Sequence, residues 1–160
     1  MTDNDKIERV VELTAPLSRV WRALTDHEEF GQWFQVKLEG PFKVGEISRG
    51  RITFPGYEHF VWRVIVERMD HERLFSFRWH HNDALPDEGL AERGLTDKEL
   101  ADQSTMLVEF RLAATSNGTR LTVTESGFSA IPDPHRLEIF RQNAQGWDGQ
   151  VKAIAAYVQS

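Results

Sequence analysis

Glu125 is the residue of this sequence that is best placed to do chemistry. It alternates with Leu121 and Val123 along an expected strand, so the three side chains share one face, the expected core face. A carboxylate on that face must find a partner or stay protonated. It could serve as the polar anchor of a ligand pocket, or as a general acid or base with a raised pKa. Two structural alternatives stay open: a bulge at Gly127 that turns Glu125 outward, or a buried ion pair with an arginine such as Arg51.

Aromatic side chains on two strands and a C-terminal helix could face this carboxylate. With one amide, the candidates for a ligand site are Trp62, Phe77, Trp79, Phe140, Asn143 and Trp147. Together they would line an apolar pocket with a few polar points, which is typical of small-molecule sites of roughly 300 to 1,000 Å³. Plain core packing is the alternative for each aromatic residue. Gly146 and Gly149 favour a cavity or a close approach, because glycine inside a helix costs about 1 kcal/mol relative to alanine.

Arginines and histidines offer two further candidate groups. Arg49 and Arg51 share a strand face, and one of them could point into the sheet concavity to meet Glu125 or an anionic ligand group. The alternative is an exposed arginine at the sheet edge. His80 and His81 are adjacent on an expected strand, so they point to opposite faces and cannot share a metal unless the strand ends between them.

We expect no metal and no cofactor. His59 or Asp83 could lie near the two histidines, but no spacing in the sequence requires it. The sequence contains no Gly-x-Ser-x-Gly, phosphate-binding loop, dinucleotide fingerprint or His-Glu-x-x-His motif. Without cysteine, it has no disulfides, thiolate metal sites or cysteine nucleophile.

The hydrophobic period indicates the elements that must position these residues. A strand with one wetter face spans Ile7 to Leu13, and Pro16 suits the first turn of a helix that runs to Thr25. Asp26 is placed to cap a second short helix, with Glu29 three residues on to complete a capping box. Turn-forming residues then separate strands near 36–40, 46–54, 59–68 and 73–80, and Asn117-Gly118 predicts a hairpin between two later strands.

A long amphipathic helix is expected from Asp133 onward. Its apolar residues step alternately by three and four positions, at Leu137, Phe140, Ala144, Trp147, Val151, Ile154 and Val158. Consecutive strands pair antiparallel, and a helix with one apolar stripe must pack across a face of their sheet. The sequence therefore predicts an α+β architecture, in which a curved antiparallel sheet is wrapped around the long helix.

Length and charge exclude several function classes. The chain has 160 residues and a formal net charge of −6, and seven acidic residues lie between positions 83 and 102. A nucleic-acid interface needs clustered lysine and arginine, so we expect no nucleic-acid partner, and an anionic membrane surface is disfavoured likewise. The first residues lack the order of a secretory signal and no apolar run is long enough to span a membrane, so a cytoplasmic protein is expected. The sequence leaves a monomer and a homodimer equally open.

The order of five motifs resembles the START-like (SRPBCC) helix-grip class, and within it the domain shared with the activator of Hsp90 ATPase. The motifs are Ala15-Pro16, residues 20–26 (VWRALTD), Trp33-Phe34, residues 119–128 (TRLTVTESGF) and Gly146-Trp147. The resemblance implies one helix-grip domain over residues 1–160, with a cavity between the sheet and the last helix. Across the class such cavities hold lipids, sterols, aromatic polyketides or hormones.

The resemblance does not imply one reaction, because a fold alone does not decide function. The first expectation is a binder of a small apolar or aromatic molecule, with Glu125 and Arg51 orienting its polar end. The alternatives are a cyclase or dehydratase that uses Glu125 as its acid or base, and a chaperone-associated interaction protein. Residues 82–103 form an acidic insertion relative to the family pattern, which could be a lid, a surface for a protein partner or a solvated loop.

Overall fold

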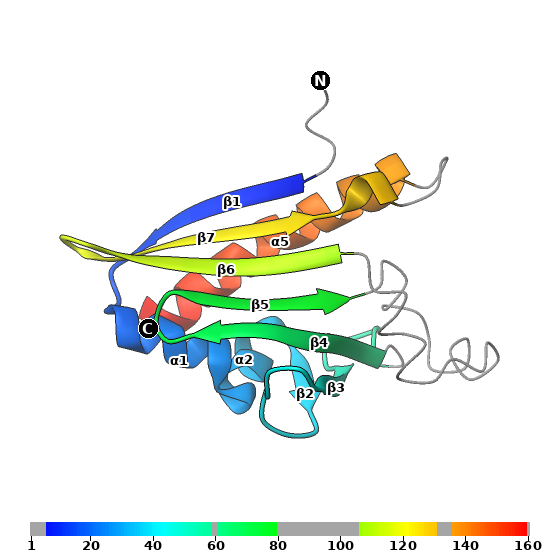
Figure 1. Ribbon diagram of the computed structural model, residues 1–160, viewed down its shortest axis with the longest axis horizontal. Coiled ribbons are helices and arrows are strands. Elements are labelled where there is room, and N and C mark those ends of the chain that lie inside the picture. The colour runs from blue at the N-terminus through cyan, green and yellow to red at the C-terminus, as the bar shows by residue number, and fades with distance from the viewer. Residues whose placement is uncertain (1–5, 59–60, 80–105, 131–135, 160) are drawn as a thin grey trace.

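A seven-stranded antiparallel sheet contains all the strands of the described chain, which comprises residues 6–58, 61–79, 106–130 and 136–159 of the computed structural model (Figure 1). The strand order is β1-β7-β6-β5-β4-β3-β2, so only β1 lies beside a strand distant in sequence. The strands are β1 (Lys6–Leu13), β2 (Val36–Leu38), β3 (Ile47–Ile52), β4 (Val61–Asp70), β5 (Leu74–Trp79), β6 (Met106–Thr115) and β7 (Gly118–Ser126).

Helices lie across one face of this sheet. Two short helices follow the first strand, α1 (Leu17–Thr25) and α2 (His27–Phe34), and a 3-10 turn, η1 (Phe128–Ala130), follows the last one. The long helix α5 (Arg136–Gln159) runs beside the β1–β7–β6 part of the sheet and contacts β1, α1 and α2 (Figure 1). The α+β helix-grip architecture expected from the sequence is therefore confirmed.

The apolar stripe of α5 packs as expected except at its first member. Trp147, Ile154 and Val158 are buried, and Phe140, Ala144 and Val151 pack half-buried against the core. Leu137, however, is 45% exposed. It lies in the first turn of α5, and α5 extends past the ends of β1 and β7 in the view of Figure 1.

One buried row of side chains crosses five strands and contains a single charged residue. The pairing of β1, β7, β6, β5 and β4 aligns Ile7, Glu125, Val108, Phe77 and Val66. All five residues are at most 2% exposed, and Glu125 is fully buried. Directly paired residues share a face of the sheet, so Glu125 lies on the face that the helices cover.

At the start of α2, the expected N-cap forms but the expected capping box does not. The Asp26 side chain accepts hydrogen bonds from the backbone N–H groups of Glu28 and Glu29 at 3.0 and 3.1 Å, as expected for an N-cap. The predicted capping box does not form. The Asp26 N–H donates to the Arg22 carbonyl at the end of α1, and the Glu29 carboxylate instead pairs with Arg19 and Arg22.

We expect Asp26→Ala to lower the free energy of unfolding by about 1 kcal/mol, because two N–H groups at the start of α2 lose their acceptor. Urea unfolding of both proteins measures the difference. Asp26→Asn keeps an acceptor oxygen and is the matched control, expected to stay close to the unsubstituted chain. An equal loss in both variants would show that the charge, and not the cap, stabilises this helix.

The hairpin between β6 and β7 turns one residue earlier than the sequence indicates. Thr115 pairs with Gly118, so Ser116 and Asn117 form the turn and Gly118 already belongs to β7. A Cβ atom on Gly118 would lie 2.1 Å from the backbone oxygen of Leu13. Glycine is therefore required here by the close approach of the chain at the end of β1.

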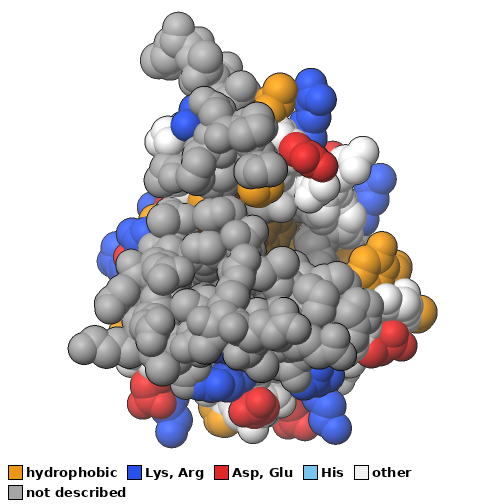
Figure 2. Space-filling model, turned by 90° about the vertical axis from the view of Figure 1, so that its right-hand side faces the viewer, with side chains coloured by type: hydrophobic (Ala, Val, Ile, Leu, Met, Phe, Trp, Pro, Cys, Tyr) orange, Lys and Arg blue, Asp and Glu red, His pale blue; other side chains and the backbone are white. Residues whose placement is uncertain are grey.

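Charged side chains form exposed ion pairs between neighbouring elements. Arg9 of β1 pairs with Asp148 of α5 at 2.6 Å, and Arg120 of β7 pairs with Glu12 of β1 at the same distance. On the face shown in Figure 2, basic and acidic side chains of the described chain are interspersed along the lower rim. Each exposed ion pair of this kind contributes little to the free energy of unfolding.

Candidate functional site

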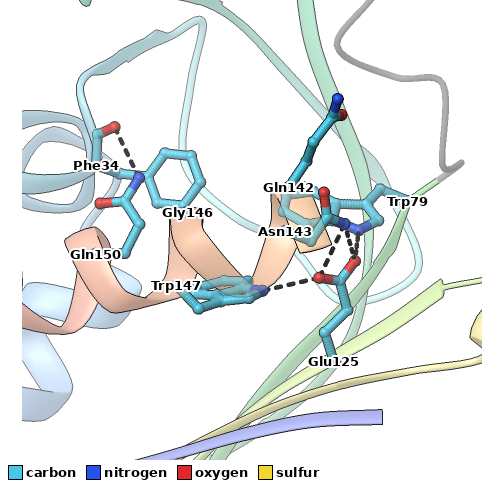
Figure 3. Close-up of a pocket in the computed structure, with 8 residues that line it drawn as sticks. All are labelled: Phe34, Trp79, Glu125, Gln142, Asn143, Gly146, Trp147 and Gln150. Carbon is cyan, nitrogen blue, oxygen red and sulfur yellow. Dashed lines mark hydrogen bonds between the residues drawn. The ribbon is translucent and has the colours of Figure 1, made fainter. Parts of the chain in front are cut away.

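The Glu125 carboxylate is surrounded by nitrogen donors from two other elements (Figure 3). The indole Nε1–H of Trp79 donates to Oε2 and that of Trp147 donates to Oε1, each at 2.8 Å. The Asn143 amide nitrogen lies 3.1 Å from both oxygens. All of these partners donate and all are neutral, so the arrangement fits a carboxyl group that accepts hydrogen bonds through both oxygens.

Local structure explains why these donors converge. Asn143 and Trp147 are four residues apart on α5, so their side chains lie on the same face of the helix, one turn apart. Trp79 is the last residue of β5, two strands from Glu125 in the sheet. Long side chains from the sheet and the helix thus meet at a carboxyl group that the period of β7 turns inward.

Burial and hydrogen bonding act on this carboxyl group in opposite directions. Removal from water disfavours the charged form and raises the pKa of Glu125, while the N–H donors of Trp147, Trp79 and Asn143 offset part of that rise. The net effect is a pKa above the ordinary glutamate value. Such a group can hold or release a proton closer to neutral pH than an exposed glutamate does.

A small hollow of about 150 Å³ adjoins Glu125 between the sheet and α5. It is lined by Phe34, Trp79, Glu125, Gln142, Asn143, Gly146, Trp147 and Gln150. This volume is below the 300 to 1,000 Å³ expected from the sequence for a small-molecule site. Aromatic side chains explain the difference, because the rings of Phe30, Phe34 and Trp62 pack within 4.8 to 5.7 Å of one another under the sheet.

Gly146 keeps this hollow open. Apart from its chain neighbours and the backbone of its own helix, no atom of the described residues lies within 4 Å of the position that a Cβ on Gly146 would take, and the residue lines the hollow. Gly149 also has open space at its Cβ position, but it does not line the hollow. Within the described part of the chain, neither glycine therefore makes the close approach that the sequence left open.

The structure brings together half of the residues expected at a ligand site. Trp79, Glu125, Asn143 and Trp147 all line the hollow. The other four residues lie outside its lining. Trp62 and Phe77 are core residues whose rings contact each other at 5.7 Å between centroids, and half-buried Phe140 packs on Phe128 at 5.0 Å.

Arg51 lies on the other face of the sheet. Arg51 pairs with Val61, whereas the preceding residue, Gly50, pairs with Trp62 on the buried face. Successive residues of a strand point to opposite faces of the sheet, so Arg51 points away from the buried face. Arg51 is exposed and borders a separate surface hollow with Lys37 and Arg49. The structure thus excludes the buried ion pair of Arg51 with Glu125, and it also excludes an outward turn of Glu125 at Gly127, since Glu125 is fully buried.

Besides Gly146, three lining residues were not among the expected site residues. Gln142 and Gln150 lie four residues before and after Gly146, so the helical period starting from Gly146 would have identified both. Phe34 ends α2, and its ring packs against those of Trp62 and Trp147 at 5.7 and 6.5 Å between centroids. No spacing in the sequence indicates that contact, because it depends on how α2 docks beside α5.

Several sequence predictions fall on residues outside the described part of the chain. These are His59, His80, His81 and Asp83, together with the acidic segment 82–103. Among residues 6–58, 61–79, 106–130 and 136–159, no group of three or more histidine, aspartate or glutamate side chains could hold a metal ion. In the same ranges, the structure contains no helix with the length and apolar character to cross a membrane.

Comparisons with known proteins agree with this architecture. A family model described as "Activator of Hsp90 ATPase homolog 1-like protein" matches residues 14–159. A search of curated proteins finds no match. Similar solved structures include a Mesorhizobium loti protein (18% identity, 96% of each chain covered, TM-score 0.69) and a Chromobacterium violaceum protein (20% identity, 98% of this chain and 99% of that one, TM-score 0.69).

A third similar solved structure is that of a protein from a biosynthetic locus. The protein is DynU16 of the dynemicin biosynthetic locus, at 22% identity and a TM-score of 0.70. The similarity covers 98% of this chain but 48% of DynU16. At these levels of identity the solved structures establish the helix-grip fold, while the chemistry of the chain depends on its own site.

Proposed function

This chain belongs to the activator of Hsp90 ATPase homolog 1-like family, and on that premise we propose that it binds a small hydrophobic or aromatic molecule in the hollow between the sheet and α5. The observation that carries the proposal is open space directly beside a buried, hydrogen-bonded carboxyl group. A cavity needs few polar groups to orient a ligand, and apolar walls supply most of the affinity.

The size of the hollow supports a ligand with one aromatic ring. An engineered apolar cavity of about 150 Å³ in another protein accepts benzene, and the hollow here has about the same volume. Phe34, Trp79 and Trp147 supply the apolar walls, and Glu125 supplies the buried polar point. The exposed Gln142 lines the outer part, where a polar substituent of the ligand would meet water.

We expect Gly146→Leu to abolish binding of a one-ring probe such as indole, because the new side chain projects into the hollow. Ligand-detected NMR with indole, repeated on each variant, measures the effect. Gly149→Leu is the matched control: it makes the same change one turn away, at a glycine that also has open space but does not line the hollow. Both substitutions improve helix propensity by about 0.8 kcal/mol, so both variants should fold.

The two variants separate the proposal from its competitors. Binding that survives in Gly149→Leu and disappears in Gly146→Leu supports the hollow as the site. Equal binding in both variants would locate the probe elsewhere on the molecule. No binding to the unsubstituted protein at millimolar indole would contradict the proposed function.

A second candidate function is acid–base catalysis by Glu125 on a bound substrate. The observation that favours it is the raised pKa of the fully buried Glu125. Native mass spectrometry of the purified protein would identify a molecule that remains bound, and turnover of that molecule can then be assayed. Glu125→Gln should abolish turnover while retaining the molecule if Glu125 is the acid or base, whereas unchanged turnover would remove that role.

A further inference from the structure

Glu125 has no cationic partner among the described residues. Its hydrogen-bond donors there are two indoles and one amide, all of which are neutral. The residues that face it from β1 and β6 are Ile7 and Val108. A buried carboxylate ordinarily pairs with a lysine or arginine, because hydrogen bonds from neutral donors compensate only part of the lost hydration.

Charged side chains on the covering helix do not supply that partner. Arg141 and Asp148 are the charged residues of α5 nearest in sequence to Asn143 and Trp147, and both are exposed. Asp148 pairs with Arg9 on the surface. Among the described residues, neither lysine nor arginine lines the hollow, so a negative charge on Glu125 would be the largest charge acting on its contents.

Aromatic side chains line the hollow next to Glu125. The ring centroids of Trp79 and Trp147 are 6.2 Å apart with an interplanar angle of 27°, and Phe34 lies 6.5 Å from Trp147. Both indoles direct their N–H edges to Glu125 and their rings stack on each other, so neither N–H group is left to bind a ligand.

We propose that the ligand of this hollow is an organic cation, an aromatic or alkyl ammonium compound, whose charge is balanced by the Glu125 carboxylate and whose apolar part packs against the aromatic side chains that line the hollow. This inference rests on the proposed function and specifies its ligand class. The ammonium group needs no direct hydrogen bond to Glu125, whose oxygens already accept from three side chains. It acts through charge, and attraction to a buried carboxylate is stronger than attraction between two groups in water.

The experiment compares three probes that share one ring and differ in charge at neutral pH: benzylammonium, benzyl alcohol and benzoate. Dissociation constants for the unsubstituted protein are measured by titration calorimetry or ligand-detected NMR. We expect benzylammonium to bind at least about tenfold more tightly than benzyl alcohol, because the buried charge of Glu125 attracts the ammonium group. Benzoate should bind most weakly, because two carboxylates would share one site.

Two variants locate the origin of the preference. Glu125→Gln should reduce the preference for benzylammonium over benzyl alcohol to about onefold. Asp148→Asn removes the same charge from the exposed surface of α5, outside the hollow, and should leave the preference unchanged. Circular dichroism establishes that each variant is folded. If Glu125→Gln does not fold, the three-probe comparison on the unsubstituted protein still decides the question.

The outcomes distinguish this inference from the function on which it rests. Tight binding of benzyl alcohol with no gain for benzylammonium would overturn the ammonium proposal and leave a neutral aromatic ligand. Binding of none of the three probes would overturn both. A preference for benzylammonium that persists in Glu125→Gln, or that is lost in Asp148→Asn, would assign the recognition to surface charge and contradict the role of Glu125.

Discussion

Truncating Trp147 to alanine is expected to lower the free energy of unfolding by about 3–5 kcal/mol. The side chain is 4% exposed and packs against Phe34, Trp79 and Phe110, so its removal leaves a cavity between α5 and the sheet. It also removes the N–H group that donates to Glu125 at 2.8 Å. Urea unfolding followed by far-ultraviolet circular dichroism measures the loss without depending on tryptophan fluorescence.

Trp147→Phe separates the two contributions to this loss. Phenylalanine keeps most of the packing but lacks the N–H group, so we expect a smaller loss of about 1.5–3 kcal/mol, typical of a hydrogen bond to a charged group. Leu137→Ala is the control on the same helix. Leu137 is 45% exposed, so its substitution should change the free energy of unfolding by no more than about 0.5 kcal/mol. A loss for Trp147→Ala no larger than that of Leu137→Ala would contradict the position of Trp147 in the core.

Raising the pH is expected to destabilise the unsubstituted protein relative to Glu125→Gln. The folded protein holds the Glu125 proton more tightly than the unfolded chain does, because burial raises the pKa of Glu125 in the folded state. The favourable contribution is therefore fully present below the unfolded pKa of about 4.3 and is lost as the pH rises through the higher folded pKa. Each unit between the two pKa values corresponds to about 1.4 kcal/mol.

Urea unfolding of both proteins at intervals between pH 4 and pH 8 measures this effect. The difference between the two unfolding free energies is the informative quantity, since other titrating groups cancel in it. Glutamine places its NH₂ group against one of the two indole N–H donors, so the variant is expected to be less stable at low pH by about 1–3 kcal/mol. Its disadvantage should shrink as the pH rises. A constant difference would show that folding does not change the Glu125 pKa.

Much of this fold can be predicted from the period of apolar residues. Alternation in β7 correctly places Glu125 on the buried face, because Leu121 and Val123 leave one choice of face. The steps of three and four in α5 correctly identify its buried side from Phe140 onward, and only Leu137, the first member, is exposed. These signals are strong because each element buries one face against a large core and exposes the other.

The site itself is less predictable, because it depends on docking between elements. Arg51 was expected as a site residue, and its strand is ambiguous since Ile47 and Ile52 fall on opposite faces. Only the pairing of Gly50 with Trp62 shows which face is buried. Gly146 and Gly149 look equivalent in sequence, yet only Gly146 lines the hollow, because Trp79 and Phe34 approach α5 at that turn.

The pairing of β1 with β7 affects the order in which the protein can fold during synthesis. Lys6 lies opposite Ser126, so the first strand of the sheet leaves the ribosome 120 residues before its partner. At about 5–20 residues per second, β1 waits roughly 6 to 24 seconds without that neighbour. The buried row that contains Glu125 is completed only when β7 arrives, and α5 is made later still. The donors from α5 therefore reach the Glu125 carboxyl group only after the strand that carries it has been synthesised.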